Sequence, residues 1–154
     1  MADRLRAIGG GQTGADQAGW RAARRCGLET GGWMPKGFLT EEGPRPEFAS
    51  LYDAVETATD RYPERTEANV RDSDATLWFG STDTPGAKTT LNACRGMGRP
   101  TLIVEPGMRP SEVAAWLRRL PRLRVLNVAG NRESKAPGIG GRVEAFLVAV
   151  FERL

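Results

Sequence analysis

Short apolar runs alternate along this chain with stretches in which apolar residues recur at helical spacing. Four such runs predict strands, at 5–8, 75–79, 101–104 and 125–128, of which 75–79 and 101–104 are expected to be buried, and residues 28–32 give a weaker strand signal. Strands separated by helices favour a parallel sheet with right-handed crossovers. The pattern therefore predicts the α/β class, with a mainly parallel sheet of about five strands and helices on both faces.

The helical stretches differ in how clear their apolar faces are. Residues 13–26 carry a thin face of small residues that can pack close to a sheet, and Gly27 ends this helix. Two further faces, behind Pro110 and at the end of the chain, are formed by Val113, Trp116, Leu117, Leu120, Val143, Phe146, Leu147, Val150 and Leu154. A weaker helical face comprises Phe48, Leu51, Tyr52 and Val55. The polar segment 35–46, rich in Pro and Gly, is long for a plain connection and is predicted to be a functional loop.

The composition is that of one ordinary globular domain over residues 1–154. Hydrophobic residues make up 40% and charged residues 27% of the chain, and no apolar run approaches the ~18 residues of a membrane span. Two cysteines and no histidine disfavour a zinc site and histidine-based nucleophiles, and they fit a reducing cytoplasm. A net charge of +3 suits a small anionic ligand, and is too weak and dispersed to favour nucleic acid.

The glycine-rich segment 9–16 is the clearest candidate for ligand binding. It follows a predicted strand and opens a predicted helix, where unpaired backbone N–H groups can hold a phosphate. Gly9, Gly11 and Gly14 satisfy the G-x-G-x-x-G pattern, and Gly11→Val is expected to block ligand approach without unfolding the domain. The dinucleotide fingerprint also needs an acid about 20 residues on, and residues 31–35 contain none. The segment predicts an anion site without the usual mode of NAD binding.

Two more polar, glycine-rich loops follow predicted strands, at 80–90 and 129–142. The first of these carries five hydroxyls and Lys88, but Ala87 separates Gly86 from Lys88, so the P-loop spacing fails. The other offers basic side chains and a helix start. Because ligands of parallel sheets bind beyond the carboxyl ends of the strands, the three loops are expected to converge on one site. A capped turn and a solvated charged loop are the structural alternatives for the second and third loops.

Several residues near these loops also have structural interpretations. Thr13 and Asp16 have the spacing of a helix capping box. Trp33 is expected in the loop after the second strand, where it could pack or stack on a flat heterocycle. Asp72 and Asp74 precede a strand and suit turns. Arg65 lies one helical turn before Asn69, so the two can share a face.

Five ordered motifs carry a resemblance that covers most of the chain, from about residue 8 to residue 139. They are GGQTGAD (10–16), GWMPKG (32–37), RT with NV (65–66 and 69–70), DSDAT (72–76) and NRESKAPGI (131–139). Together they resemble the molybdenum cofactor carrier proteins, circularly permuted relatives of the YpsA group. This group belongs to a Rossmann-like superfamily that includes cytokinin-activating phosphoribohydrolases and a DNA-processing protein. The resemblance implies a single Rossmann-like domain.

The resemblance also implies binding and protection of the molybdenum cofactor or a similar phosphorylated heterocycle. The metal is held by the cofactor's own dithiolene, so no metal ligand is expected from the protein. The related enzymes carry a Pro-Gly-Gly-x-Gly-Thr-x-x-Glu motif, whereas here Asn92 and Ala93 follow Thr89 and Thr90 without the glutamate. No catalytic residue is therefore assigned. The alternative is a nucleotide-binding sensor or a nucleotide-processing, phosphoribohydrolase-like enzyme.

The motifs and loops together give the predicted cofactor-binding residues. These are Gly10, Gly11, Gln12, Thr13, Gly14, Asp16, Trp33, Lys36, Arg65, Ser81, Thr82, Gly86, Lys88, Thr89, Asn131, Arg132, Ser134 and Lys135. The relatives bind ligand as oligomers, so a homodimer or homotetramer with closed symmetry is expected. The partner is a small anionic ligand; no membrane association is predicted.

Overall fold

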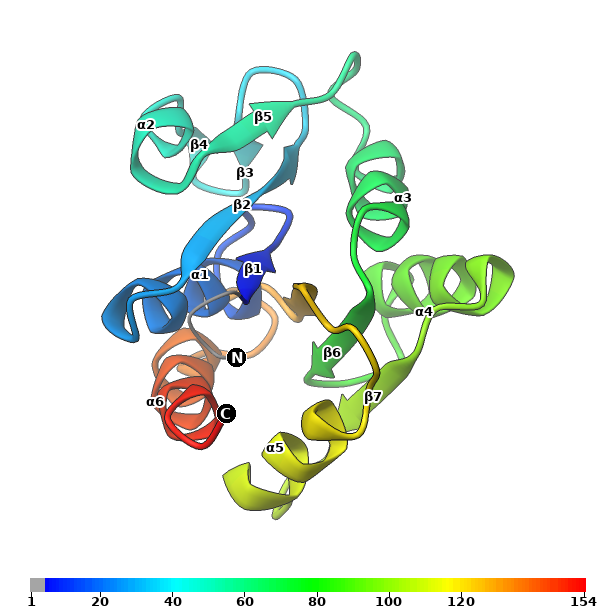
Figure 1. The fold of residues 1–154 in the computed structure, drawn as a ribbon. Helices are drawn as coiled ribbons and strands as arrows, with labels where there is room; N and C mark the ends of the chain where they lie inside the picture. Colours follow the sequence, from blue (N-terminus) through cyan, green and yellow to red (C-terminus); the bar gives the residue numbers. More distant parts are fainter. Residues whose placement is uncertain (1–4) are drawn as a thin grey trace.

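A computed structural model describes residues 5–154 and shows a parallel sheet between two layers of helices (Figure 1). The sheet has six strands, in the order β5 (Ala54–Glu56), β2 (Glu29–Met34), β1 (Arg6–Ile8), β8 (Val125–Gly130), β6 (Ala75–Phe79) and β7 (Thr101–Val104). Every neighbouring pair is parallel. The predicted α/β class is confirmed. Residues 1–4 of the predicted domain lie outside the described residues.

The helices divide between the two faces of the sheet. On one face, α6 (Ile139–Phe151) packs against both α1 (Ala15–Arg25) and α5 (Pro110–Arg118). On the other face, α3 (Tyr62–Arg71) packs against α4 (Pro85–Met97) (Figure 1). No helix within residues 5–154 is long and apolar enough to cross a bilayer.

The chain path places three loops side by side. From β1 the chain runs outward through β2 to β5, and α3 then carries it across to β6. After β7, the chain returns to β8, which lies between β1 and β6. The carboxyl ends of β1, β8 and β6 are therefore adjacent, and the three predicted loops follow these three strands. Such a reversal of strand order is where α/β sheets bind ligands.

Small residues let α1 lie close to the sheet, as its thin apolar face predicts. Ala15, Ala18 and Ala22 are fully buried, and a Cβ on Gly19 would lie 2.7 Å from the Cβ of Val128. A second, smaller apolar cluster sits beside the main core. In it, the indole of Trp20 stacks on Tyr52 with the ring centroids 4.7 Å apart, and Phe48 and Met34 are buried next to it.

The structure corrects several predicted boundaries. Strand β2 runs on to Met34, so Trp33 lies in a strand and the predicted loop position is wrong. The weak helix is the short α2 (Phe48–Tyr52), which ends because Asp53 adopts a left-handed conformation with φ of 59°. Val55 then belongs to the unpredicted strand β5 and is exposed. The first helix begins at Ala15 rather than at residue 13.

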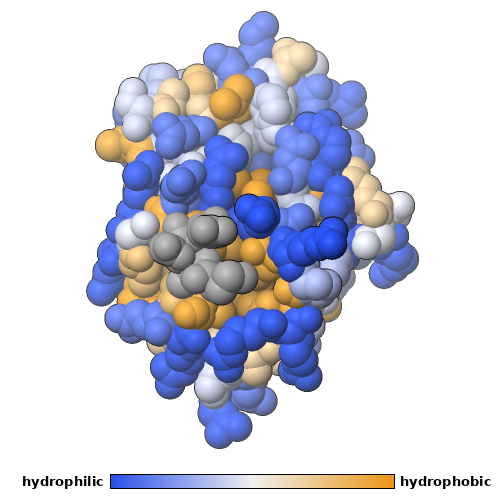
Figure 2. Space-filling model, in the orientation of Figure 1, coloured by the Kyte–Doolittle hydropathy of each residue, from blue (hydrophilic) through white to orange (hydrophobic). Residues whose placement is uncertain are grey.

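Part of the segment 35–46 forms a hairpin, which the sequence pattern did not predict. Its strands are β3 (Leu39–Thr40) and β4 (Gly43–Pro44), joined by a turn at Glu41 and Glu42. On the face shown in Figure 2, hydrophilic residues surround a hydrophobic area at the centre.

Candidate functional site

The three loops meet through backbone contacts at the carboxyl edge of the sheet. The amide of Ala15 donates to the carbonyl of Asn131 at 3.2 Å, which joins the first loop to the third. The Asn131 side chain accepts from the amide of Ser81 at 2.7 Å, which joins the third loop to the second. A Cβ on Gly14 would lie 2.5 Å from the Asn131 carbonyl oxygen. Gly14 is therefore required for the close approach of the first and third loops.

Glycines of the first loop make room for neighbouring side chains. Gly11 has φ of 77°, and a Cβ there would meet the buried side chain of Met34. A Cβ on Gly10 would overlap the guanidinium of Arg65. Gly11→Val would be strained at this φ and would have to shift Met34 in the smaller apolar cluster, and its effect on the fold stays a prediction.

A largely buried ion pair between Arg65 and Asp16 contacts the first loop. Asp16 is 3% exposed; its carboxylate accepts from Arg65 Nη1 at 3.2 Å and from the amide of Gln12 at 3.2 Å. Burial raises the pKa of Asp16, and the charge of Arg65 opposes that rise. The guanidinium also lies over the ring of Tyr62, 5.3 Å from its centroid. Arg65 thus holds the carboxylate of Asp16 in place, and Asp16 in turn holds the first loop through the amide of Gln12.

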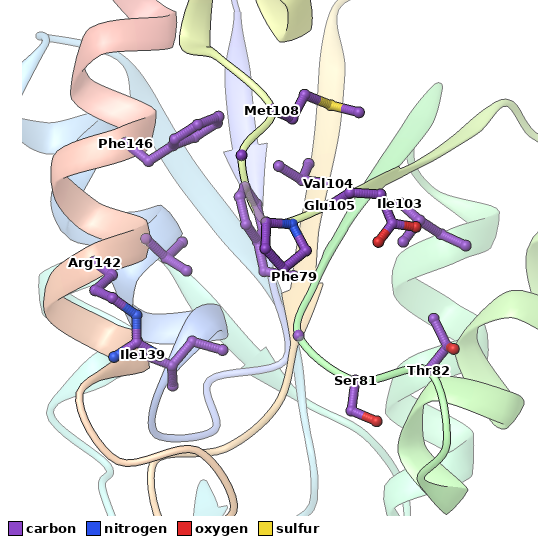
Figure 3. A pocket seen from close by; sticks show the side chains of 14 residues that line it. Phe79, Ser81, Thr82, Ile103, Val104, Glu105, Met108, Ile139, Arg142 and Phe146 are labelled. Carbon is purple, nitrogen blue, oxygen red and sulfur yellow. The ribbon is translucent and has the colours of Figure 1, made fainter.

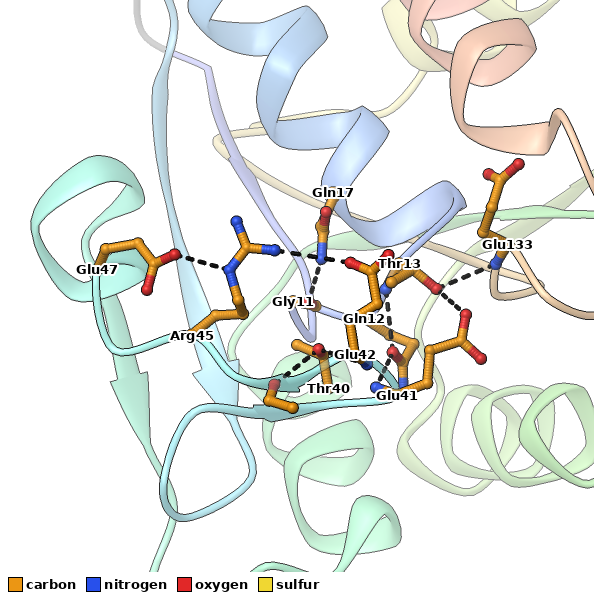
Figure 4. Close-up of polar contacts among 11 residues, drawn as sticks. Gly11, Gln12, Thr13, Gln17, Thr40, Glu41, Glu42, Arg45, Glu47 and Glu133 are labelled. Carbon is orange, nitrogen blue, oxygen red and sulfur yellow. Dashed lines mark hydrogen bonds and ion pairs between the residues drawn. The ribbon is translucent and has the colours of Figure 1, made fainter.

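The predicted capping box is wrong, because its two side chains have other partners. The N-cap of α1 is Gly14, and no side chain caps this helix. The Thr13 hydroxyl instead accepts from the amide of Glu133 at 3.1 Å and donates to the Glu41 carboxylate (Figure 4). Thr13 therefore connects the first loop with the third loop and with the β3–β4 hairpin.

Two glutamates supply carboxylates to backbone N–H groups of the third loop. Glu41 accepts from the amide of Ser134 at 3.2 Å and from its hydroxyl at 2.5 Å. Glu133 accepts from the amides of Gly138 and Gly140 at the start of α6, at 2.5 and 3.0 Å. Although partial desolvation opposes it, hydrogen bonding to hydroxyls and the Ser134 amide lowers the pKa of Glu41. The amides of Gly138 and Gly140 lower the pKa of Glu133.

In the second loop, a threonine hydroxyl accepts the hydrogen bond of a backbone amide at the start of α4. Thr84 is the N-cap of α4, and its hydroxyl accepts from the amide of Ala87 at 3.1 Å, as the capped-turn alternative predicts. Ser81 and Thr82 are exposed before it. Lys88 is exposed and lies 3.7 Å from the carboxylate of Asp83. The amide of Lys88 also donates to Thr84, through its carbonyl, and Pro85 has no N–H, so in the first turn of α4 Gly86 is the exposed residue whose N–H has no bond of this kind.

A cavity of about 660 Å³ opens beside this loop, between β6, β7 and α6 (Figure 3). Its walls are mainly apolar and come from Phe79, Ile103, Val104, Met108, Ile139, Val143 and Phe146. Arg142 on α6 borders one side, and Ser81 and Thr82 border the opposite side. Glu105, at the end of β7, also lines the cavity. Within residues 5–154, no group of three or more Cys, Asp or Glu side chains is placed to hold a metal ion.

Comparison with known proteins assigns the chain to a family. A model of the circularly permutated YpsA SLOG family matches residues 7–151. The chain belongs to this family. It is also similar to a solved structure from Syntrophus aciditrophicus SB named "Putative molybdenum carrier protein", with 32% sequence identity and a TM-score of 0.83. That match covers 96% of this chain and 94% of the other. No curated protein matches.

In this member of the circularly permutated YpsA family, most predicted cofactor-binding residues fall into two neighbouring groups. One group forms the junction of the first and third loops: Gly10, Gly11, Gln12, Thr13, Gly14, Asp16, Arg65, Asn131, Arg132 and Ser134. The other lies on the second loop and the first turn of α4: Ser81, Thr82, Gly86, Lys88 and Thr89. Lys135 is exposed on the third loop.

Trp33 and Lys36 lie apart from these two groups. The indole of Trp33 donates to Asp72 at 2.8 Å, and its backbone is fixed by the Asn69 side chain at 2.8 and 3.0 Å. Those bonds hold Trp33 on the α3 side of the sheet. Lys36 is exposed in the turn after β2, where its amide donates to the carbonyl of Thr59 at 2.8 Å.

Sequence reasoning missed four side chains that shape this family member's site. Glu105 directly follows a predicted strand, so its position at the carboxyl edge could have been found. Arg142 occupies the first turn of the last helix, a place that the segment 129–142 already included. Glu133 lies in the third loop, within the motif at residues 131–139. Nothing in the pattern marked Glu41, because its hairpin brings it to the site from 28 residues beyond Thr13.

Proposed function

We propose that this protein binds and carries the molybdenum cofactor or a closely similar phosphorylated heterocycle. The observation that carries the proposal is the cavity beside the second loop, which combines apolar walls with Arg142 and two hydroxyls. Its volume of about 660 Å³ lies within the range of about 300–1,000 Å³ usual for small-molecule sites. The name of the similar solved structure supports the same ligand class.

The chemistry of the cavity suits such a ligand. Ile139 and Phe146 from α6, with Val104 from β7, provide apolar surface for a flat pterin. Arg142 and the hydroxyls of Ser81 and Thr82 provide donors for its phosphate and polar edge, and charge-assisted bonds from arginine to phosphate are among the stronger ones. In this arrangement the protein supplies shelter and orientation.

One observation favours a second candidate function, nucleotide processing. Of the aspartates on the first and second loops, Asp16 is buried against Arg65 and Asp83 is exposed beside Lys88. Glu105, in contrast, lines the cavity. A carboxylate that faces a bound nucleotide can act as a general acid or base. This candidate therefore depends on Glu105.

The ligand is best identified by mass spectrometry of small molecules released from natively purified protein. A pterin phosphate is the expected result. Arg142→Ala is expected to lower retention of that ligand about ten-fold or more, since a hydrogen bond to a charged group contributes about 1.5–3 kcal/mol. Arg118→Ala is the matched control, because Arg118 lies on α5 and donates to the backbone carbonyl of Arg153 at 2.8 Å, just as Arg142 donates to that of Pro137 at 3.2 Å. Equal retention in both variants would overturn the cavity assignment.

Incubation with AMP tests the second candidate function. The carrier proposal expects no measurable release of base. Release approaching ~1 s⁻¹, the low end for enzymes, and lost in Glu105→Gln would establish nucleotide processing instead. The homo-oligomer expected from the resemblance remains a proposal, and light scattering at micromolar concentration tests it.

A further inference from the structure

The turn of the β3–β4 hairpin places a carboxylate among donors that are suited to a phosphate. We propose that Thr13, Ser134 and Arg132 form an anion subsite, that the Glu41 carboxylate occupies it, and that a phosphate group binds there when the hairpin tip lifts. This subsite is separate from the cavity beside the second loop. The hairpin acts as a built-in competitor for the subsite.

The donors around Glu41 come from two different loops. The Thr13 hydroxyl comes from the first loop, and the backbone amide and hydroxyl of Ser134 come from the third. Arg132 Nε lies 3.9 Å from the carboxylate and adds positive charge. A hydroxyl, a backbone N–H and a guanidinium around one oxyanion are the donors that proteins use for phosphate. The Glu41 side chain is only 16% exposed there.

The hairpin is attached differently at its base and at its tip. Its base is held by apolar contacts, because Phe38 and Phe48 pack in the cluster around Trp20. The tip is held by polar contacts: the carboxylate of Glu41, and its amide, which donates to Gln12 Oε1 at 2.8 Å. An anion can replace the carboxylate and leave the apolar base in place. The tip can therefore open without unfolding of the domain.

Competition of this kind lowers the apparent affinity for an anion. A ligand binds only the fraction of molecules in which the carboxylate has left, so its dissociation constant rises in proportion. Removal of the carboxylate frees the donors and removes a negative charge from the subsite. Glu42 provides a matched control, since it is the next residue of the same turn and pairs with Arg45 at 3.6 Å outside the subsite.

The test measures binding of inorganic phosphate, and of AMP as an esterified phosphate, by isothermal titration calorimetry. Glu41→Ala is expected to bind at least one of these probes about ten-fold more tightly than the wild type, and Glu42→Ala to bind like the wild type. Adding Arg132→Ala or Ser134→Ala to Glu41→Ala is expected to reduce the gain. Glu41→Gln, which keeps the size of the side chain, gives a smaller gain and serves if the alanine variant fails to fold.

Hydrogen exchange in the wild type provides a second readout. Saturating phosphate is expected to speed exchange of the Glu41 amide, because lifting the tip breaks its bond to Gln12. The amide of Arg45, which donates to the carbonyl of Phe38 nearer the hairpin base, is expected to change less. The proposal is overturned if neither Glu41 variant gains affinity for either probe, or if Glu42→Ala gains as much as Glu41→Ala.

Discussion

The junction of the first and third loops and the second loop satisfy their backbone N–H groups in different ways. In the junction, carboxylates accept from the amides: Asp16 from Gln12, Glu41 from Ser134, and Glu133 from the start of α6. In the second loop a hydroxyl, that of Thr84, caps the helix. The junction is largely buried, whereas Ser81 and Thr82 are exposed.

The difference shows that a glycine loop at a helix start can serve the fold as readily as a ligand. Buried N–H groups need partners, and a carboxylate of the same chain provides a stronger one than water does. The junction has such partners already, so an incoming anion must displace one. The second loop borders the cavity and carries no carboxylate at its helix cap. A ligand that binds at this helix cap would displace no carboxylate from it.

The largest expected effect separates the two regions through matched glycines. Gly14→Ala would place its Cβ 2.5 Å from the Asn131 carbonyl oxygen, at a residue with φ of 81°. The neighbouring atoms are backbone and cannot turn aside, so we expect a loss of about 4 kcal/mol or more, or no folded protein. Gly86→Ala on α4 meets nothing within 4 Å and is expected to raise stability slightly. Urea denaturation measures the stability of both variants. A Gly14→Ala protein as stable as the wild type would contradict the close approach of the first and third loops at Gly14.

The second expected effect concerns the ion pair beneath the first loop. Arg65→Met leaves the buried carboxylate of Asp16 without its charged partner, which typically costs about 3–5 kcal/mol. We expect about 3 kcal/mol at pH 7, since the Arg65 side chain is 14% exposed. Adding Asp16→Asn is expected to recover part of that loss, and a double-mutant cycle measures the coupling.

The pH dependence of Arg65→Met has a definite sign. Burial already raises the pKa of Asp16 above its ordinary value, and loss of the arginine raises it further. The folded state then holds the proton more tightly than the unfolded state does. Stability of the variant therefore increases as the pH falls toward the raised pKa, and the deficit relative to the wild type shrinks. A deficit that stays constant from pH 8 to pH 5 would show that charge burial is not its cause.

The fold could be predicted where the hydrophobic periodicity is strong. The prediction failed where tertiary contacts determine the secondary structure. The positions of five strands and the small-residue face of α1 followed from local patterns, but of β7, expected to be buried, only Val104 is buried. Strand β5 did not, because Val55 is exposed and fitted a helical face as well as a strand. The β3–β4 hairpin has only two residues in each strand, and its position depends on apolar contacts of Phe38 and Phe48.

The convergence of the loops was predictable, whereas the partners of their side chains were not. A rule about parallel sheets placed residues 9–16, 80–90 and 129–142 at one edge. The spacing of Thr13 and Asp16 indicated a capping box, yet Arg65 and Glu133 lie 49 and 120 residues away from the groups that they bind. Such distant partners leave no local signal. The same holds for Trp33, whose position depends on Asn69 and Asp72.

The smallest effect tests the carboxylate at the start of α6. Glu133→Gln keeps the shape of the side chain but removes the charge that accepts from Gly138 and Gly140, so we expect a loss of about 1 kcal/mol at pH 7, typical of a helix cap. The pKa of Glu133 is lowered from its ordinary value of 4.5 in the folded protein. Its contribution is therefore complete above about pH 4.5 and is lost as the pH falls through the lowered pKa. Urea denaturation of wild type, Glu133→Gln and the exposed control Glu29→Gln from pH 7 to pH 3 follows this loss. A Glu133→Gln deficit that persists unchanged at pH 3 would show that the negative charge of Glu133 is not the cause of the deficit.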